Sequence, residues 1–184
     1  MVKSQIDALG IIFPNSYDNQ VPALCNERLM ASIPFASRYR MIDFILSSMV
    51  YCGIENISVI VRKNYRSLMR HLGSARSWDL SRKNGGLNLV PPFAEKTVKV
   101  YNGRVEALAS IIDFLKIQKE KYVFISDANI VTNFNYNAML DAHKASGADV
   151  TIAYREEEIP EAFMNLQATV STDLYYTLRF DESG

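Results

Sequence analysis

The sequence predicts an α/β fold in which a mostly parallel, mixed sheet is flanked by helices. Three short and almost continuous apolar runs are typical of strands that are buried on both faces, as in a parallel sheet. Stretches with apolar residues at helical spacing separate these runs, and this alternation is typical of β–α–β crossover units. The three runs are residues 6–13, 56–61 and 122–126.

The first strand is followed by a polar loop and then by an amphipathic helix. Asn, Ser, Asp and Gln dominate residues 15–26, which favours a loop, and Ser37 is a candidate N-cap for the helix that follows. Gly53 has the position of a residue that commonly ends such a helix. The face of this helix that we expect in the core consists of Tyr39, Ile42, Ile45, Leu46 and Met49.

The middle of the chain combines a short helix with a long irregular insertion. We expect a helix over residues 65–72 and the insertion over residues 74–103. An insertion of this length is usually functional or part of an interface, and the alternative is a surface excursion packed by Trp78 and Phe93. Two short strands around a turn are expected in it, at 87–90 and 97–101.

The last part of the chain continues the same alternation. Apolar residues at helical spacing predict helices over residues 105–118 and 136–146, and residues 149–154 predict a further strand. Alternation at 167–171 and 174–180 predicts an antiparallel hairpin that is added to the sheet near the C-terminus.

Composition and charge argue against several classes of protein. The chain has 20 Lys and Arg and 20 Asp and Glu residues, and a formal net charge of zero argues against nucleic acid as the main partner. No apolar run approaches the roughly 20 residues that a membrane-spanning helix needs, and no signal peptide is recognisable. Cys25 and Cys52 lack metal-ligand spacing, so we expect reduced thiols and a cytoplasmic protein.

The passage from the first strand to the first helix is where α/β proteins commonly bind phosphate, because backbone N–H groups converge there. Glycines usually allow a phosphate to approach the backbone of such a loop. Here no glycine occurs between Gly10 and Gly53. The loop therefore has the position and length for phosphate binding without the usual residues.

Four segments resemble one family of nucleotidyltransferases. Residues 34–44, PFASRYRMIDF, are similar to its segment P-F-G-G-K-Y-R-x-I-D-F, and residues 78–93 resemble its W-D-L-x-R-x-x-G-G-x-x-x-L-P-P insertion. Residues 101–108 and 142–153 resemble its Y-x-G-T-A-x-A-I and H-K-x-x-x-A-D-V-T-I-A stretches. Over nearly its whole length the chain thus resembles glucose-1-phosphate adenylyltransferase, or ADP-glucose pyrophosphorylase, and the W-D-L insertion is the specific part.

The resemblance implies a Rossmann-like nucleotidyltransferase domain over residues 1–184. It implies that a left-handed β-helix domain follows in the family, which is absent from this fragment. It also implies the conversion of ATP and glucose 1-phosphate to ADP-glucose and diphosphate, with Mg²⁺ held by an aspartate at the end of a strand.

The phosphate loop departs from the family pattern G-G-x-G-x-R. An ungapped comparison puts Asn15, Ser16 and Asp18 at the three glycines and Gln20 at the arginine. Residues 30–31, Met-Ala, replace a Lys-Pro pair. We therefore expect obstructed backbone contacts, the loss of two cations, and an added carboxylate where phosphates would lie.

The metal strand departs as well. The family's S-G-D-H becomes Ser-Asp-Ala-Asn at residues 126–129, so that Ala128 has the position of the metal-binding aspartate. Asp127 is one residue away, and a shift by one residue turns a side chain to the other face of a strand. The family's Gly-Thr before the later helix has become Gly103 and Arg104. Since metal ions and cationic groups stabilise the transition state of phosphoryl chemistry, these losses predict little activity.

This pattern of losses resembles the non-catalytic regulatory subunit of bacterial ADP-glucose pyrophosphorylase. The hypothesis is a regulatory subunit that joins the catalytic subunit in a heterotetramer for glycogen biosynthesis, with no catalytic residue, cofactor or metal of its own. One alternative is a slow but genuine ADP-glucose-forming enzyme that binds Mg²⁺ through Asp127. Another is a sensor that binds a nucleotide or sugar phosphate without turnover.

Several polar residues remain as candidates for a ligand cleft. Arg40 and Asp43 are predicted to form a pair within a helix, and ligand contact is the alternative. Arg62 has the position of a base-binding glutamine in the family, and is interpreted as an exposed strand-end residue or as a contact to a phosphate-bearing effector. His71 and His143 are interpreted as helix residues without a catalytic role. The cleft candidates are Asn15, Ser16, Gln20, Arg40, Asp43, Arg62, Gly86 and Asp127.

Overall fold

The computed structural model describes residues 6–91, 103–156 and 178 of the chain. Two compact units are present, Met1–Gly147 and Ala148–Gly184. Every described helix and strand lies in the first unit.

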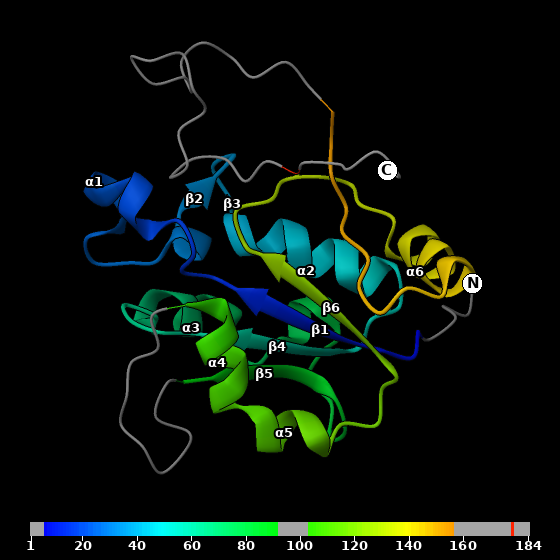
Figure 1. Cartoon of the computed structure of the whole chain (residues 1–184). Helices are drawn as coiled ribbons and strands as arrows, with labels where there is room; N and C mark the ends of the chain where they lie inside the picture. Colours follow the sequence, from blue (N-terminus) through cyan, green and yellow to red (C-terminus); the bar gives the residue numbers. More distant parts are fainter. Residues whose placement is uncertain (1–5, 92–102, 157–177, 179–184) are drawn as a thin grey trace. The chain divides into compact units, whose positions relative to one another are not determined.

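The described part of the first unit is built on a parallel sheet (Figure 1). Its strands are paired in the order β5-β4-β1-β6, and the register places Ile11 of β1 between Ser58 and Ile125 of its two neighbours. The strands predicted over 6–13, 56–61 and 122–126 and the mostly parallel α/β fold are thereby confirmed. The strands are β1 (Ala8–Phe13), β4 (Asn56–Ile60), β5 (Gly86–Val90) and β6 (Tyr122–Asp127).

Helices connect these strands and cover them. The predicted helix over 136–146 has the predicted bounds, and Gly147 ends it with a positive φ of 65°. The helices are α1 (Pro22–Cys25), α2 (Met41–Tyr51), α3 (Arg66–Leu72), α4 (Arg104–Ser110), α5 (Ile112–Lys116) and α6 (Tyr136–Ser146), with 3-10 turns at Asp18–Gln20, Met30–Ser32 and Arg76–Trp78.

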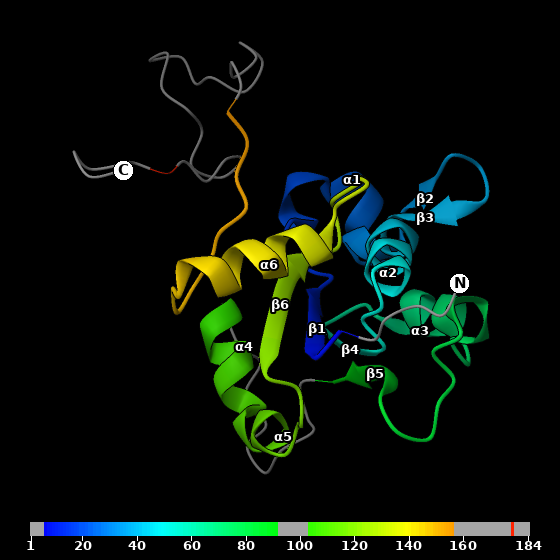
Figure 2. The ribbon, with the colours of Figure 1, turned by 90° about the vertical axis from the view of Figure 1, so that its right-hand side faces the viewer.

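Alternate residues of β1 face two separate hydrophobic cores. Ala8 and Ile12 lie in the core formed with α2, α3 and α6, whereas Leu9, Ile11 and Phe13 lie in the core formed with α4 and α5. Figure 2 shows these two groups of helices on opposite sides of the sheet. In a strand that is buried on both faces, apolar residues do not alternate with polar ones, because every side chain faces a core. This arrangement explains the continuous apolar run in the sequence.

The start of α2 differs from the prediction. The helix begins at Met41 with Arg40 as its N-cap, and the preceding residues form a two-stranded antiparallel hairpin of β2 (Pro34–Phe35) and β3 (Tyr39–Arg40). Ser37 lies at the tip of this hairpin with a φ of 67°, next to Ala36 with a φ of 48°, so it caps no helix. A two-residue strand leaves too short a pattern to be recognised.

The predicted core face of α2 is correct except for its first member. Ile42, Ile45, Leu46 and Met49 are buried, but Tyr39 is 49% exposed because it precedes the helix. Its ring packs against Phe44 with 5.9 Å between the ring centroids. The expectation that Tyr39 faces the core is therefore wrong.

The helix predicted over 105–118 is interrupted. Helix α4 ends before Ile111, which has φ −113° and ψ 18°, and α5 follows it directly. Ile111 is buried in the core on this face of the sheet. The apolar spacing continues across the break, so periodicity alone could not reveal it.

The insertion contributes a strand to the main sheet. Residues 86–90 form β5, which pairs in parallel with β4. The predicted partner strand at 97–101 and Phe93 lie outside the described residues, and so does almost all of the hairpin predicted over 167–180. Trp78 is half-buried and packs against the core beneath α2 and α3.

The strand predicted over 149–154 is not present in the described part of the second unit. These residues have no regular secondary structure, and Val150, Ile152 and Tyr154 are exposed. A strand needs a neighbour to accept and donate its backbone hydrogen bonds, and neither of the sheets formed by the described strands includes this segment.

Both cysteines behave as structural thiols. Cys25 and Cys52 are free and buried, as the sequence predicts. Burial, followed by the nearby Asp18 carboxylate, raises the pKa of the Cys25 thiol. A raised pKa keeps the thiol protonated, which makes it a poor nucleophile.

Gly86 is expected to tolerate no side chain. Its φ is +78°, and a Cβ there would lie 2.4 Å from the backbone oxygen of Leu80. We expect Gly86→Ala to lower the free energy of unfolding by about 2–4 kcal/mol, from left-handed strain plus overpacking. Gly147→Ala is the matched control, because its φ of +65° is similar but no atom lies within 4 Å of the added Cβ. Equal shifts in urea midpoint for the two variants would show that the close approach of Leu80 does not constrain Gly86.

Tyr136 is expected to make stability depend on alkaline pH. Burial raises the pKa of Tyr136 to about 12, although a hydrogen bond with Ser126 acts in the opposite direction. Between the ordinary tyrosine pKa of about 10 and this raised value only the unfolded state loses the proton, so the free energy of unfolding falls as pH rises, by up to about 1.4 kcal/mol per pH unit. Tyr136→Phe should flatten this slope in urea denaturation, whereas Tyr51→Phe, at an exposed position, should leave it unchanged.

Candidate functional site

The carboxyl ends of the parallel strands bring several of the candidate residues to one edge of the sheet. Asn15 and Ser16 follow β1, Arg62 follows β4, and Asp127 ends β6. Ligands of open α/β sheets bind at this edge. Gly86 does not belong to it, since it begins β5 opposite Asn56 at the amino-terminal edge.

Asn15 connects the loop after β1 to the end of β4. Its Oδ1 accepts a hydrogen bond of 3.0 Å from the backbone N–H of Arg62. Its Nδ2 donates to Oδ2 of Asp18 at 2.8 Å. The asparagine therefore supports the loop from within, in a position where the resemblance implies a glycine.

Asp18 lies inside the loop and is only 5% exposed. Its Oδ1 accepts a hydrogen bond of 2.7 Å from the backbone N–H of Met30, while Oδ2 accepts from Asn15. The expectation that this carboxylate stands where phosphates would lie is wrong, because a buried carboxylate requires donors and finds them in its own loop. Gln20 ends the adjacent 3-10 turn and is exposed.

Asp127 is held by a cation and a hydroxyl. The guanidinium of Arg104 donates to it twice, from Nη2 to Oδ2 at 2.6 Å and from Nε to Oδ1 at 3.2 Å. The hydroxyl of Ser16 donates to Oδ1 at 2.6 Å. Three separate segments therefore meet at this carboxylate: the loop after β1, the start of α4 and the end of β6.

Ala128, the residue that follows, contributes no ligand atom. Its side chain is buried in the core that includes α2 and α6, and its backbone N–H donates to the oxygen of Phe13 at 3.1 Å. Within the described residues, no group of three or more His, Cys, Asp or Glu side chains is arranged to hold a metal ion.

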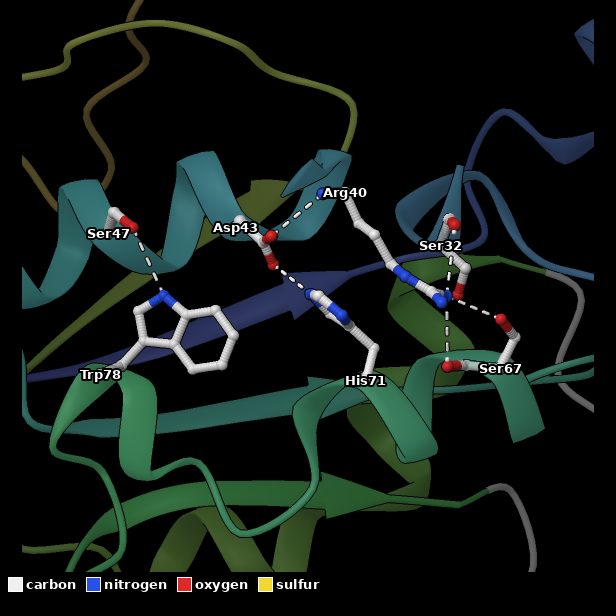
Figure 3. Close-up of polar contacts among 7 residues, drawn as sticks. All are labelled: Ser32, Arg40, Asp43, Ser47, Ser67, His71 and Trp78. Atoms are coloured by element: carbon white, nitrogen blue, oxygen red, sulfur yellow. Dashed lines mark hydrogen bonds and ion pairs between the residues drawn. The ribbon is translucent and has the colours of Figure 1, made fainter. Parts of the chain in front are cut away.

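Arg40 and Asp43 belong to a second polar cluster, between α2 and α3 (Figure 3). The Asp43 carboxylate accepts the backbone N–H of Arg40 at 2.9 Å, whereas the Arg40 guanidinium turns away to Ser67, whose hydroxyl it reaches at 2.7 Å. The predicted ion pair between their side chains is therefore wrong. Arg40 precedes the first helical turn, and spacing by three residues brings side chains together only within a helix.

His71 completes this second cluster. Its Nε2 lies 2.6 Å from Oδ1 of Asp43, and its ring packs edge-on against Trp78, as Figure 3 shows. Trp78 in turn donates from Nε1 to the hydroxyl of Ser47 at 3.3 Å. These contacts tie α3 and the following 3-10 turn to α2, which is a structural role and agrees with the interpretation of His71 as a helix residue.

Several participants in these clusters, Arg104 and Ser67 among them, are not among the cleft candidates that the sequence indicates. Arg104 is visible in the sequence only as a departure from the family pattern, and Ser67 does not stand out at all. A signal for Arg104 exists: in a β–α–β unit the helix starts at the same edge of the sheet where the next strand ends. For Ser67 there is no signal, because a serine at a helix start is common.

Apolar side chains line a shallow groove beside the second cluster. The groove, of about 380 Å³, lies between α2 and residues 131–133 and is lined by Tyr39, Phe44 and Val131 together with Asp43. Ser48 donates a hydrogen bond to the oxygen of Thr132 there, which holds residues 131–133 against α2. Among the described residues, no helix has the length and hydrophobicity needed to cross a membrane.

A family model described as nucleotidyl transferase matches residues 21–167. The glycogen biosynthesis protein GlgD of Geobacillus stearothermophilus is 40% identical over 148 residues, which are 78% of this chain and 42% of that protein. GlgD of Bacillus subtilis is 32% identical, over 91% of this chain and 49% of that protein. A glucose-1-phosphate adenylyltransferase of Bacillus cytotoxicus is 33% identical, over 88% and 43%. The chain spans about half the length of these relatives.

A solved structure agrees on the fold. The crystal structure of a putative glucose-1-phosphate thymidylyltransferase from Bacillus anthracis superposes with a TM-score of 0.56 and 15% identity, and the match covers 75% of this chain and 50% of that one. At this level of identity the likeness concerns the fold alone.

Asp18 is expected to be essential for the shape of the loop after β1. In Asp18→Asn an amide N–H₂ would face either the backbone N–H of Met30 or the amide of Asn15, so we expect a loss of about 1–3 kcal/mol in the free energy of unfolding. Hydrogen exchange in residues 14–32 should accelerate. Asp113→Asn is the control, since Asp113 is 81% exposed and its ion pair with Lys116 is long, at 3.8 Å. If both variants unfold at the same urea concentration, Asp18 does not support the loop.

Proposed function

Because this chain belongs to the nucleotidyl transferase family, we propose that it acts in glycogen biosynthesis as a regulatory, non-catalytic subunit of glucose-1-phosphate adenylyltransferase. The proposed partner is the catalytic subunit that forms ADP-glucose and diphosphate from ATP and glucose 1-phosphate. The proposal includes a hetero-oligomer, in the family a heterotetramer, and a cytoplasmic location.

The pairing of Asp127 is the observation that carries this proposal. Asp127 is the carboxylate at the end of β6, and both of its oxygens accept hydrogen bonds from Arg104 or Ser16. A carboxylate that is to bind a catalytic Mg²⁺ must offer free oxygen atoms. The neighbouring Ala128, buried in the core, has none to offer.

The loop after β1 supports the same proposal. Asn15 and Asp18 use their side chains to hold the loop together, whereas a phosphate loop presents its backbone N–H groups to the ligand. The match to the nucleotidyl transferase family model begins at residue 21, within this loop, so that Asn15, Ser16 and Asp18 lie outside the matched range. The fold is retained although these residues of the loop differ from the family pattern.

The relatives point to the pathway but differ in their names. Two are named glycogen biosynthesis protein GlgD and another glucose-1-phosphate adenylyltransferase. The name glycogen biosynthesis protein GlgD states no catalytic activity, whereas the name glucose-1-phosphate adenylyltransferase does. We therefore assign the chain to the regulatory side of this group.

A subunit without turnover regulates its partner only by binding differently to the partner's conformational states. Any such preference shifts the populations of these states, and with them the affinity of the catalytic subunit for substrates and effectors. The proposed subunit therefore needs an intact fold and interface but no chemistry of its own.

One specific observation favours a second candidate function, a slow but genuine nucleotidyltransferase. Asp127 keeps a carboxylate at the end of β6, and this candidate requires that a substrate complex release it from Arg104. In that case Mg²⁺ would be required for turnover. A nucleotide or sugar-phosphate sensor is the third candidate, and it predicts ligand binding without product.

The decisive measurement is ADP-glucose formation by the full-length protein, alone and mixed with the catalytic subunit, in the presence of Mg²⁺. We expect no product above the blank from the protein alone, and a changed substrate or activator response in the mixture. Turnover by the protein alone would establish the second candidate. Binding of ATP or glucose 1-phosphate without any effect on the partner would establish the sensor.

A revertant tests whether altered residues account for the expected inactivity. Because Asp18 supports the loop, Asp18→Gly alone should only destabilise the protein, and the family residues must be restored together. We expect the combined revertant to gain measurable turnover in the full-length protein; no gain in a folded revertant would mean that the altered loop does not explain the inactivity. The changes are Asn15→Gly, Ser16→Gly, Asp18→Gly, Gln20→Arg, Met30→Lys, Arg104→Thr and Ala128→Asp.

A further inference from the structure

A positively charged side chain, that of Arg104 at the start of α4, lies at the end of β6. The Arg104 guanidinium grips the Asp127 carboxylate with two hydrogen bonds, and its shorter contact of 2.6 Å is typical of a strong, charge-assisted pair. Arginine stays protonated at every physiological pH. The positive charge beside Asp127 therefore does not depend on pH.

A divalent metal does not fit this arrangement. Mg²⁺ demands near-ideal octahedral coordination by oxygen atoms at about 2.0–2.1 Å. Among the described residues, the side chains in hydrogen-bond contact with Asp127 are Arg104 and Ser16, and both already donate to its carboxylate, while the next residue, Ala128, is apolar and buried. A second cation would also meet the repulsion of the guanidinium at close range.

We propose that Arg104 is the resident cation of this site: it excludes a divalent metal from Asp127 and, through Asp127 and Ser16, holds the loop after β1 against β6. The inference rests on the proposed function only in assuming that no catalytic metal is needed. Arg104 acts here as a positioning residue, since it holds the carboxylate of Asp127, which in turn accepts a hydrogen bond from Ser16.

The proposal gives the three segments a common anchor. Ser16 belongs to the loop after β1, Arg104 begins α4, and Asp127 ends β6. In an enzyme of this family a bound metal and nucleotide would be expected to organise this edge. Here side chains of the protein itself make contacts that connect the three segments.

The test is the binding of Mn²⁺, followed through the electron paramagnetic resonance signal of the free ion, to the full chain and its variants. Arg104→Gln removes the charge at similar length and should raise the affinity for Mn²⁺ by on the order of tenfold or more. Adding Asp127→Asn to this variant should abolish the gain. Arg104→Lys keeps a positive charge and should bind Mn²⁺ as weakly as the wild type.

Arg82→Gln is the matched control. Arg82 is 35% exposed and Arg104 36%, and Arg82 also pairs with carboxylates, those of Glu55 and Asp79. Its replacement should leave Mn²⁺ binding unchanged. Any gain seen equally in both variants would reflect a general loss of positive charge and would overturn the proposal.

Two results on folded protein contradict the proposal directly. The first is Mn²⁺ binding by the wild type that Asp127→Asn removes, and the second is no gain in Arg104→Gln. If Arg104→Gln fails to fold, hydrogen exchange in Asp127→Asn tests the anchoring role instead. Amide hydrogens of residues 14–20 must then exchange faster than in the wild type, because the contact with Asp127 that holds these residues is lost. Unchanged exchange there would falsify the anchoring role.

These outcomes are separate from those of the proposed function. Metal binding reports only on Asp127, whereas regulation is measured by the response of the catalytic subunit in a mixture. A protein that excludes Mn²⁺ and leaves the partner unaffected would contradict the regulatory role alone. One that binds Mn²⁺ at Asp127 and still modulates the partner would contradict this inference alone.

Discussion

Burial of β1 on both faces is the constraint on which the rest of this domain depends. Each of its residues lies in one of two hydrophobic cores or beneath a helix, so no polar side chain can reach solvent from the strand itself. The polar side chains of Asn15, Arg62 and Asp127 lie instead where strands end, at one edge of the sheet. A loop that leaves such an edge without glycine offers a ligand less access to its backbone N–H groups. It is stabilised by Asn15 and Asp18, whose side chains take over the hydrogen bonding.

Much of this fold could be predicted because it follows from long apolar patterns. The runs that became β1, β4 and β6, and the helix α6, needed no information from distant parts of the chain. The predicted elements were wrong where the apolar pattern was too short to indicate a strand, or where it continued unchanged through a break in a helix. The hairpin of β2 and β3 consists of two-residue strands, and the apolar spacing of α4 continues through its break at Ile111 into α5. Residues 149–154 have the composition of a strand, but a strand also needs a partner, which composition does not supply.

The candidate site was predictable in position and much less so in its contacts. Asp127 could be placed at the ligand-binding edge because it ends a recognisable strand. Whether the carboxylate of Asp18 turns outward or inward depends on donors twelve residues away, such as the N–H of Met30, and no spacing rule identifies them. Arg104 lies 23 residues before Asp127, and the sign of a charge does not reveal its partner. The pairs that decide the chemistry are thus set by tertiary packing, whereas the edge at which they meet is set by the order of the strands.

The hairpin between β2 and β3 has a further consequence. Ala36 and Ser37 hold φ angles of 48° and 67°, in a region that costs a residue with a Cβ about 1–2 kcal/mol. In the resembling family both positions are glycine, which adopts this conformation freely. The shape of the tip is therefore imposed by the packing of Phe35 and Tyr39 on Phe44 and opposed by local preference. Such a segment stores conformational energy at the surface, and any rearrangement that returned these two residues to negative φ would be driven forward by its release.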